Sequence, residues 1–187
     1  MGKLYLLVFI NFSKLFLMDI NSFIRNVPDF PKPGVTFRDI TLMLADAKAF
    51  DFAVEKMIEP FVGEKIQKVA ATEARGFIFG SVAANKLGAG FVPVRKKGKL
   101  PFKTDVETYS LEYDEASIEV HADAFNEGER VLLLDDVLAT GGTMAAVCRL
   151  VQRQNVVIVG ISFLCELDFF NGRELLPNIP VHSILHY

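Results

Sequence analysis

The sequence contains no tryptophan and only two cysteines among its 187 residues. Its 17 phenylalanines supply the bulky apolar side chains that a core needs in place of tryptophan. Cys148 and Cys165 both lie in apolar runs and lack the spacing of metal ligands, so they are expected to be buried free thiols. Free thiols are typical of a reducing compartment, and the cytoplasm is therefore the predicted location.

An excess of positive charge is also missing. The formal net charge is −3 and the pI is about 5.6, which argues against a protein that binds nucleic acid through a broad basic surface. Any anionic ligand must therefore be held by a local arrangement of donors.

No apolar run is long enough to span a bilayer. The run at 4–10 is followed by Asn11, Ser13 and Lys14, and no small-residue cleavage site follows, so neither a membrane span nor export is predicted. Residues 1–17 are interpreted as an N-terminal extension, and residues 18–187 as a single domain.

What the chain has instead is a globular composition, with 51% hydrophobic and 23% charged residues, and an alternation of strand and helix patterns. Helical periodicity from Met18 to Val27 predicts a first helix, and three prolines make 28–34 an extended arm. Strands are expected at 68–72, 90–95, 130–136, 156–167 and 181–187, a polar hairpin around 108–122, and helices at 46–62, 77–87 with Gly88 as its end, and 144–154. This alternation predicts an α/β fold with a mainly parallel twisted sheet, whose ligands bind beyond the carboxyl ends of its strands.

The stretch VLLLDDVLATGGT at 131–143 is the most informative motif. Ala139, Thr140, Gly141, Gly142 and Thr143 lie between a buried strand and a helix, where glycine lets successive amides point at one group and the helix adds its positive end. A phosphate is the natural ligand for this loop. An unliganded strand-to-helix turn is the alternative.

Asp135 and Asp136 directly precede that loop and would repel a phosphate, so they must face a divalent cation or ligand hydroxyl groups. A ribose 5-phosphate offers a phosphate and vicinal hydroxyls at the required separation. Two competing motifs are absent, since the chain has no GxxxxGK[ST] sequence and GAGFVP lacks the third glycine of a dinucleotide fingerprint.

Several segments resemble the adenine phosphoribosyltransferases, which are type I phosphoribosyltransferases. VLLLDDVLATGGT is similar to the phosphoribosyl diphosphate motif of type I enzymes. The other similar segments, in the order of the family, are DFPKPGVTFRDIT, TEARGFIFG, FVPVRKKGKLP, YSLEY and CELDFFNGRELL. The resemblance covers about residues 19–187 and implies the type I fold, with a small hood and a mobile loop, and AMP formation from adenine and phosphoribosyl diphosphate.

The resemblance also implies roles for the donor site. It assigns Asp135 and Asp136 to the ribose hydroxyls and residues 139–143 to the 5-phosphate, with Mg²⁺ held mainly through the substrate near the two acids. Arg75 would grip the leaving diphosphate, in a turn whose Glu73–Ala74 peptide is sometimes cis in the family. The basic segment 95–103 would form the mobile loop, from which Lys96 and Lys99 would reach the diphosphate.

For the base, the resemblance makes Glu112 the proton handler at adenine N9 and places Thr36, Phe37, Arg38 and Leu167 around the ring. Thr36 departs from the family, where this position is usually more apolar. A homodimer without nucleic-acid or membrane partners is implied. His121, His182 and His186 show no partner at catalytic spacing and are interpreted as structural.

Two other functions stay open at this point. The same reaction could use hypoxanthine, guanine or xanthine, because the donor motif is shared across the wider group. Alternatively, the chain could be a regulator that binds phosphoribosyl diphosphate as an effector and acts on nucleic acid, although the sequence shows neither an appended DNA-reading domain nor a broad basic face.

Overall fold

The computed structural model describes residues 18–110 and 115–187, and the chain divides into two compact units between Phe52 and Ala53. The division falls within helix α2 (Ala47–Ile58). No helix in the described ranges is long and apolar enough to cross a membrane.

The first unit contains a 3₁₀ turn η2 (Ile20–Phe23), the antiparallel strands β1 (Arg25–Val27) and β2 (Phe37–Asp39), and the short helix α1 (Thr41–Ala45). The predicted helix from Met18 to Val27 is wrong. Asp19 caps only a single 3₁₀ turn, because the chain then pairs with β2 and Arg25 forms an ion pair with Asp39 at 3.1 Å. Backbone pairing with a distant strand therefore overrides the helical periodicity.

The proline-rich segment 28–34 is not helical, as predicted, but it is not an extended arm either. It is a closed loop that joins β1 to β2, since the amide of Phe30 donates to the carbonyl of Val35 at 3.1 Å. The Asp29 carboxylate also accepts the amide of Gly34 at 2.8 Å. Local acceptors such as these turn the chain back on itself.

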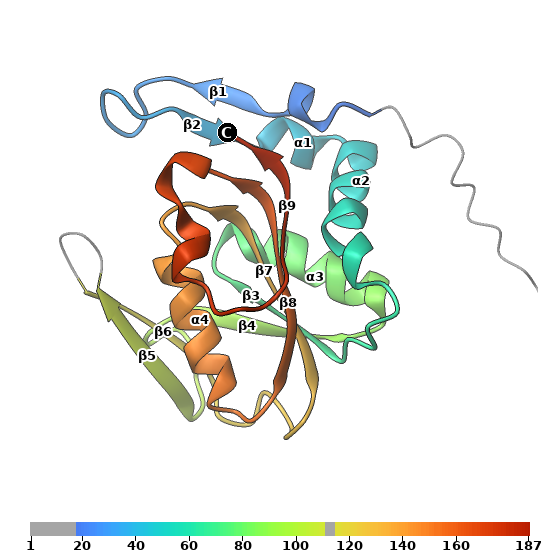
Figure 1. Ribbon diagram of the computed structural model, residues 1–187, viewed down its shortest axis with the longest axis vertical. Coiled ribbons are helices and arrows are strands. Elements are labelled where there is room, and N and C mark those ends of the chain that lie inside the picture. Colours follow the sequence, from blue (N-terminus) through green and yellow to red (C-terminus); the bar gives the residue numbers. More distant parts are fainter. Residues whose placement is uncertain (1–17, 111–114) are drawn as a thin grey trace, which may run out of the picture. The chain divides into compact units, whose positions relative to one another are not determined.

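The second unit holds a seven-stranded sheet in the order β5-β6-β4-β3-β7-β8-β9 (Figure 1). Its strands are β3 (Lys68–Thr72), β4 (Gly90–Lys96), β5 (Thr104–Ser110), β6 (Glu115–His121), β7 (Arg130–Leu138), β8 (Val157–Glu166) and β9 (Val181–His186). Neighbours from β4 to β9 run parallel, whereas β6 pairs antiparallel with both β4 and β5. The mainly parallel sheet and the polar hairpin are therefore confirmed.

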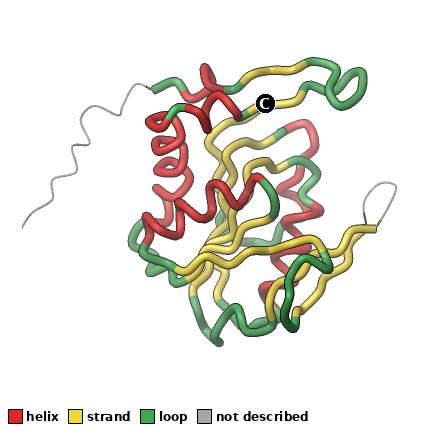
Figure 2. Tube along the Cα trace, turned by 180° about the vertical axis from the view of Figure 1, so that it is seen from behind, coloured by secondary structure: helices red, strands yellow, loops and turns green. Residues whose placement is uncertain are grey.

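Helices cover the two faces of this sheet. The helical segments are α2, α3 (Arg75–Leu87), α4 (Gly142–Gln152) and the 3₁₀ turns η3 (Glu59–Phe61), η4 (Asp168–Phe170) and η5 (Gly172–Leu175). Figure 1 shows α4 over one face, and the reverse view in Figure 2 shows α3 over the other. Three predicted helices are confirmed, with α3 ending at Leu87 before its Gly88 cap.

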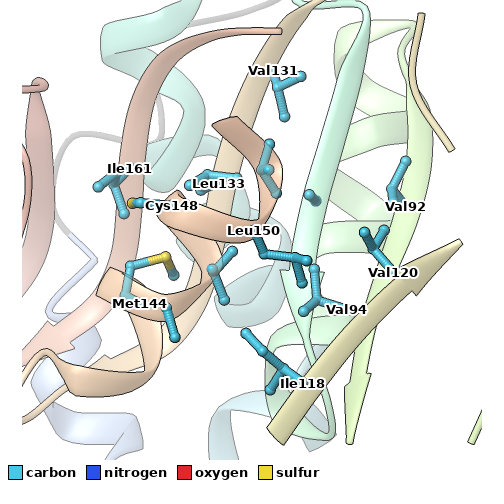
Figure 3. Close-up of a cluster of buried hydrophobic side chains, with 14 of the residues drawn as sticks. Val92, Val94, Ile118, Val120, Val131, Leu133, Met144, Cys148, Leu150 and Ile161 are labelled. Atoms are coloured by element: carbon cyan, nitrogen blue, oxygen red, sulfur yellow. The ribbon is translucent and has the colours of Figure 1, made fainter. Parts of the chain in front are cut away.

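The core under α4 is a continuous apolar cluster (Figure 3). Side chains alternate along a strand, so Val131 and Leu133 of β7 face α4 while Leu132 and Leu134 lie on the other side. The labelled members are Val92, Val94, Ile118, Val120, Val131, Leu133, Met144, Cys148, Leu150 and Ile161. This packing fixes the position of the α4 N-terminus beyond the end of β7.

Both cysteines are buried and form no disulfide with each other, as predicted. Burial raises the pKa of the Cys148 thiol to about 12, so it is not a nucleophile at neutral pH. His182 Nε2 lies 3.0 Å from the carbonyl of Lys56, whereas His186 Nδ1 lies 2.9 Å from Asp168, a carboxylate partner that the sequence spacing did not indicate. The structural role expected of the histidines stays a prediction. The His121 ring packs edge-on against Phe102.

Candidate active site

The candidate residues of the second unit gather where its parallel strands end. Strand β3 leads to Arg75, β4 ends at Lys96, β7 carries the acidic pair, and β8 leads to Leu167. Because these four strands are parallel, their carboxyl ends meet at one edge of the sheet, which is where ligands bind in such folds.

The predicted anion loop connects β7 to α4. Gly141 has φ of +83° at the helix cap, a conformation that a residue with a side chain adopts only at a cost. A Cβ at Gly141 would come within 2.2 Å of the carbonyl oxygen of Gly172, so η5 supports the loop closely from one side. The first-turn amides of α4 have no acceptor within the helix and are available for an anion.

Arg75 is the first residue of α3, directly after a cis peptide between Glu73 and Ala74. The cis form agrees with what the family resemblance implies. Arg75 Nε lies 2.6 Å from Asp136 Oδ2, and that carboxylate is almost fully buried while the arginine side chain is 39% exposed. The Arg75 side chain is therefore partly open to solvent, where a second anion could approach it.

Both carboxyl groups of the acidic pair have a raised pKa. Burial, together with the charge of Asp136, raises the pKa of Asp135 to about 7. Burial also raises the pKa of Asp136, although the charge of Arg75 opposes this shift. Helix α3 approaches very closely here, since a Cβ at Gly76 would lie 2.7 Å from Asp135 Oδ1. Glycine at that position allows the carboxylate and the α3 N-terminus to share one site.

Asp135 is expected to make the ligand-free protein less stable as pH rises from about 4 to about 7. In this window Asp135 keeps its proton in the folded chain but loses it in the unfolded chain. The stabilisation is therefore complete below the pKa that Asp135 has in the unfolded chain, and it is lost as pH rises through the pKa that it has in the folded chain. Asp135→Asn cannot titrate, and chemical unfolding at about pH 5 and about pH 7.5 should show a flatter dependence than in the parent protein. An equal slope in both proteins would contradict this assignment.

The basic segment begins at the end of β4. Lys96 and Lys99 are exposed, and the backbone between them forms a turn in which the amide of Lys99 donates to the Lys96 carbonyl at 3.3 Å. Arg95 is held by two protein groups, because its Nε donates to Glu73 at 2.7 Å and its Nη1 donates to the Lys99 carbonyl at 3.2 Å. The mobility expected of this segment stays a prediction.

The base-binding candidates fall in both units. In the first unit, Thr36 immediately precedes β2, and Phe37 and Arg38 are its first residues. Phe37 packs edge-on against Phe30, with ring centroids 5.3 Å apart. In the second unit, the amide of Leu167 donates to the carbonyl of Leu138 at 2.9 Å, which places Leu167 beside the anion loop.

The comparisons with known proteins identify the family. The family model described as the phosphoribosyl transferase domain matches residues 41–177. The chain belongs to the phosphoribosyltransferase family. Its fold is accordingly the type I phosphoribosyltransferase fold, as predicted from the motifs.

The similar family members described here are all named adenine phosphoribosyltransferase. The adenine phosphoribosyltransferase of Citrifermentans bemidjiense is 53% identical over 169 residues, which is 90% of this chain and 99% of that protein. The crystal structure of the Rhodothermus marinus enzyme has a TM-score of 0.86 at 50% identity and covers 90% of this chain and 96% of its own. The Saccharomyces cerevisiae enzyme, solved with adenine and an imino-altritol bisphosphate, has a TM-score of 0.82 at 36% identity, covering 87% and 94%.

Several contacts of this phosphoribosyltransferase site were not predicted from the sequence. The Tyr109 hydroxyl lies 3.2 Å from Thr143 Oγ1, and so links the β5–β6 hairpin to the anion loop. Within η5, Arg173 Nη2 donates to the buried carboxylate of Glu166 at 2.6 Å. No sequence spacing signals such pairs, because they join residues on separate elements. Glu112 lies outside the described residues.

Proposed function

We propose that this chain is an adenine phosphoribosyltransferase, which transfers the 5-phosphoribosyl group of phosphoribosyl diphosphate to adenine and yields AMP and diphosphate. The observation that carries the proposal is the identity of about half of all residues to enzymes of that name over nearly their whole length. The anion loop, the acidic pair and Arg75 at one sheet edge supply the chemistry this reaction needs.

The donor would bind across the ends of β3 and β7. Residues 139–143 hold the 5-phosphate through backbone amides, the α4 N-terminus and threonine hydroxyls. Asp135 and Asp136 accept hydrogen bonds from the ribose hydroxyls. The exposed side of Arg75, with Lys96 and Lys99, binds the diphosphate and stabilises the charge that grows on it as the bond to the anomeric carbon breaks. Adenine N9 then forms the new bond to that carbon.

The donor set also suits Mg²⁺. Carboxylate oxygens are the protein ligands this ion prefers, and Asp135 and Asp136 supply them near the carboxyl end of β7. Asp136 Oδ2 already contacts Arg75, so no complete protein cage is offered, and the ion would be held largely by the donor near Asp135 and Asp136. When bound, Mg²⁺ neutralises charge on the leaving diphosphate.

The base would be read by Thr36, Phe37, Arg38 and Leu167, with Glu112 taking the N9 proton. Glu112→Ala is expected to lower kcat about a hundredfold, because positioned acid–base groups contribute at least this much, while donor affinity stays the same. Steady-state rates together with donor binding by calorimetry measure the two effects. Unchanged turnover would remove Glu112 from this role.

A base panel tests the proposal. The purified protein is supplied with Mg²⁺ and phosphoribosyl diphosphate, and diphosphate release is followed with adenine, hypoxanthine, guanine and xanthine. We expect release with adenine. Release with hypoxanthine but not adenine would show a different base specificity, and tight donor binding without turnover on any base would favour the effector alternative.

The remaining assignments are proposals of the same kind. Residues 18–187 form one phosphoribosyltransferase domain, supported by a family match at 41–177 that runs across the division between the two units. The enzyme is a cytoplasmic homodimer that needs neither nucleic acid nor a membrane. Size-exclusion chromatography with light scattering would measure the molar mass of the protein and so test whether it is a dimer.

A further inference from the structure

Glu119 is a carboxylate buried inside the β5–β6–β4 part of the sheet, only 3% exposed. It is the cross-strand partner of Arg95, one residue before the Lys96 end of β4. A charge in such a position must be compensated by hydrogen bonds, since desolvation alone would be costly. The groups that donate hydrogen bonds to Glu119 therefore indicate its structural role.

Those partners are the backbone of the basic turn. Glu119 Oε1 accepts the amides of Lys99 and Leu100, both at 2.8 Å, and Oε2 accepts the Thr104 hydroxyl at 3.1 Å. Burial alone would raise the pKa of Glu119, but the bonds from the backbone of Leu100, Gly98 and Lys99 lower it below its ordinary value of 4.5. The carboxylate is thus ionised at neutral pH and holds the turn from inside.

The same turn is tied to the segment that carries Arg75. Arg95 Nη1 donates to the Lys99 carbonyl at 3.2 Å while its Nε donates to Glu73, the residue two before Arg75. One bonded chain of groups therefore runs from Glu119 through the basic turn to the Glu73–Ala74 turn. This chain of hydrogen bonds sets the spacing between the basic turn and the turn before Arg75, which are the two segments whose cationic side chains would bind the donor.

We propose that Glu119 is a positioning residue for the diphosphate part of the site. It shapes the turn so that Lys96 and Lys99 stand on the same side as Arg75, and it contacts no substrate itself. This rests on the proposed function for the identity of the diphosphate, and it goes further in assigning a role to a residue outside the loop, the acidic pair and the lysines.

Binding of two probes tests the proposal, because the anion loop and the basic turn hold different parts of the donor. Titration calorimetry with Mg²⁺ would measure inorganic diphosphate and ribose 5-phosphate separately. Glu119→Ala is expected to weaken diphosphate binding about tenfold, the equivalent of one hydrogen bond to a charged group, and to leave ribose 5-phosphate unchanged. The KM for phosphoribosyl diphosphate should rise by a similar factor while the KM for adenine stays constant.

Two further variants separate positioning from stability. Glu119→Gln keeps an oxygen that can accept the amides of Lys99 and Leu100, and it should recover most of the diphosphate affinity. If Glu119→Ala does not fold, Thr104→Val replaces it, because this variant removes only the hydrogen bond to Glu119 Oε2. Thr104→Val should weaken diphosphate binding selectively. Glu129→Ala is the matched control, since that carboxylate also accepts a backbone amide, from Asn126 at 2.9 Å, in a turn away from the sheet edge. It should change neither affinity.

Equal weakening of both probes, or unchanged diphosphate binding in Glu119→Ala, would overturn the proposal. Neither result depends on turnover. If the parent protein fails to use adenine, the proposed function is wrong, whereas the selective loss of diphosphate binding would still support the role of Glu119.

Discussion

Arg75→Ala is expected to lower kcat/KM for phosphoribosyl diphosphate about a thousandfold, the upper range for removing one donor that stabilises charge in a transition state. Arg75 begins α3 at the sheet edge and keeps an exposed side while it contacts Asp136. Its loss removes the planar donor that we propose for the leaving diphosphate. It also leaves the buried Asp136 without its cation, so the thermal midpoint should fall as well.

Arg75→Lys separates these two effects. Lysine keeps a charge near Asp136 and should preserve much of the stability, but it lacks the two-pronged geometry that binds a diphosphate. We therefore expect a near-normal melting temperature with most of the kinetic defect. A rate within about tenfold of the parent in Arg75→Ala would show that the residue does not bind the leaving group.

Gly141→Ala is expected to weaken the proposed 5-phosphate site strongly. The added Cβ would lie 2.2 Å from the Gly172 carbonyl oxygen, a backbone atom that cannot rotate away, so the loop must shift. Losing two amide bonds to the phosphate, each worth about 2 kcal/mol, corresponds to about a thousandfold weaker ribose 5-phosphate binding. Calorimetry with that ligand measures the effect, and the free energy of unfolding should fall too.

Gly128→Ala is the matched control for the backbone conformation. Gly128 also has a positive φ, +77°, but a Cβ added there would meet no atom within 4 Å. The variant should lose about 1 kcal/mol of stability from its left-handed conformation and keep normal affinity. If both variants bound ribose 5-phosphate equally well, the close approach of Gly172 would have no role in shaping the loop.

The sequence predicted the second unit well because its elements are defined by local patterns. Strand β3 matches the predicted residues 68–72, and β7 differs only in continuing to Leu138. Both are runs of apolar residues bounded by clear turns, which buried parallel strands require. The anion loop was predictable for the same reason, since it follows the acidic pair within a few residues of the chain.

The first unit shows the limit of that reasoning. Ile20, Phe23, Ile24 and Val27 have helical spacing, yet most of this stretch is not helical, because β1 pairs with β2 across a proline loop. The proposed role of Glu119 could not be predicted from the sequence either. A glutamate in an alternating strand is typical of a solvent-facing position, and only the fold brings the amides of Lys99 and Leu100 to it.

The pairing of β3 with β7 also bears on how the site comes into existence. The two strands are neighbours in the sheet, yet residues 73–129 separate them in the chain. Closing so long a segment must precede their contact, and parallel pairings of this kind form slowly. During synthesis, Arg75 is therefore made before its partner Asp136. The apolar edge of β3 stays unpaired until β7 has been made and pairs with it. A ligand held by both Arg75 and Asp136 would therefore report that β3 and β7 have paired.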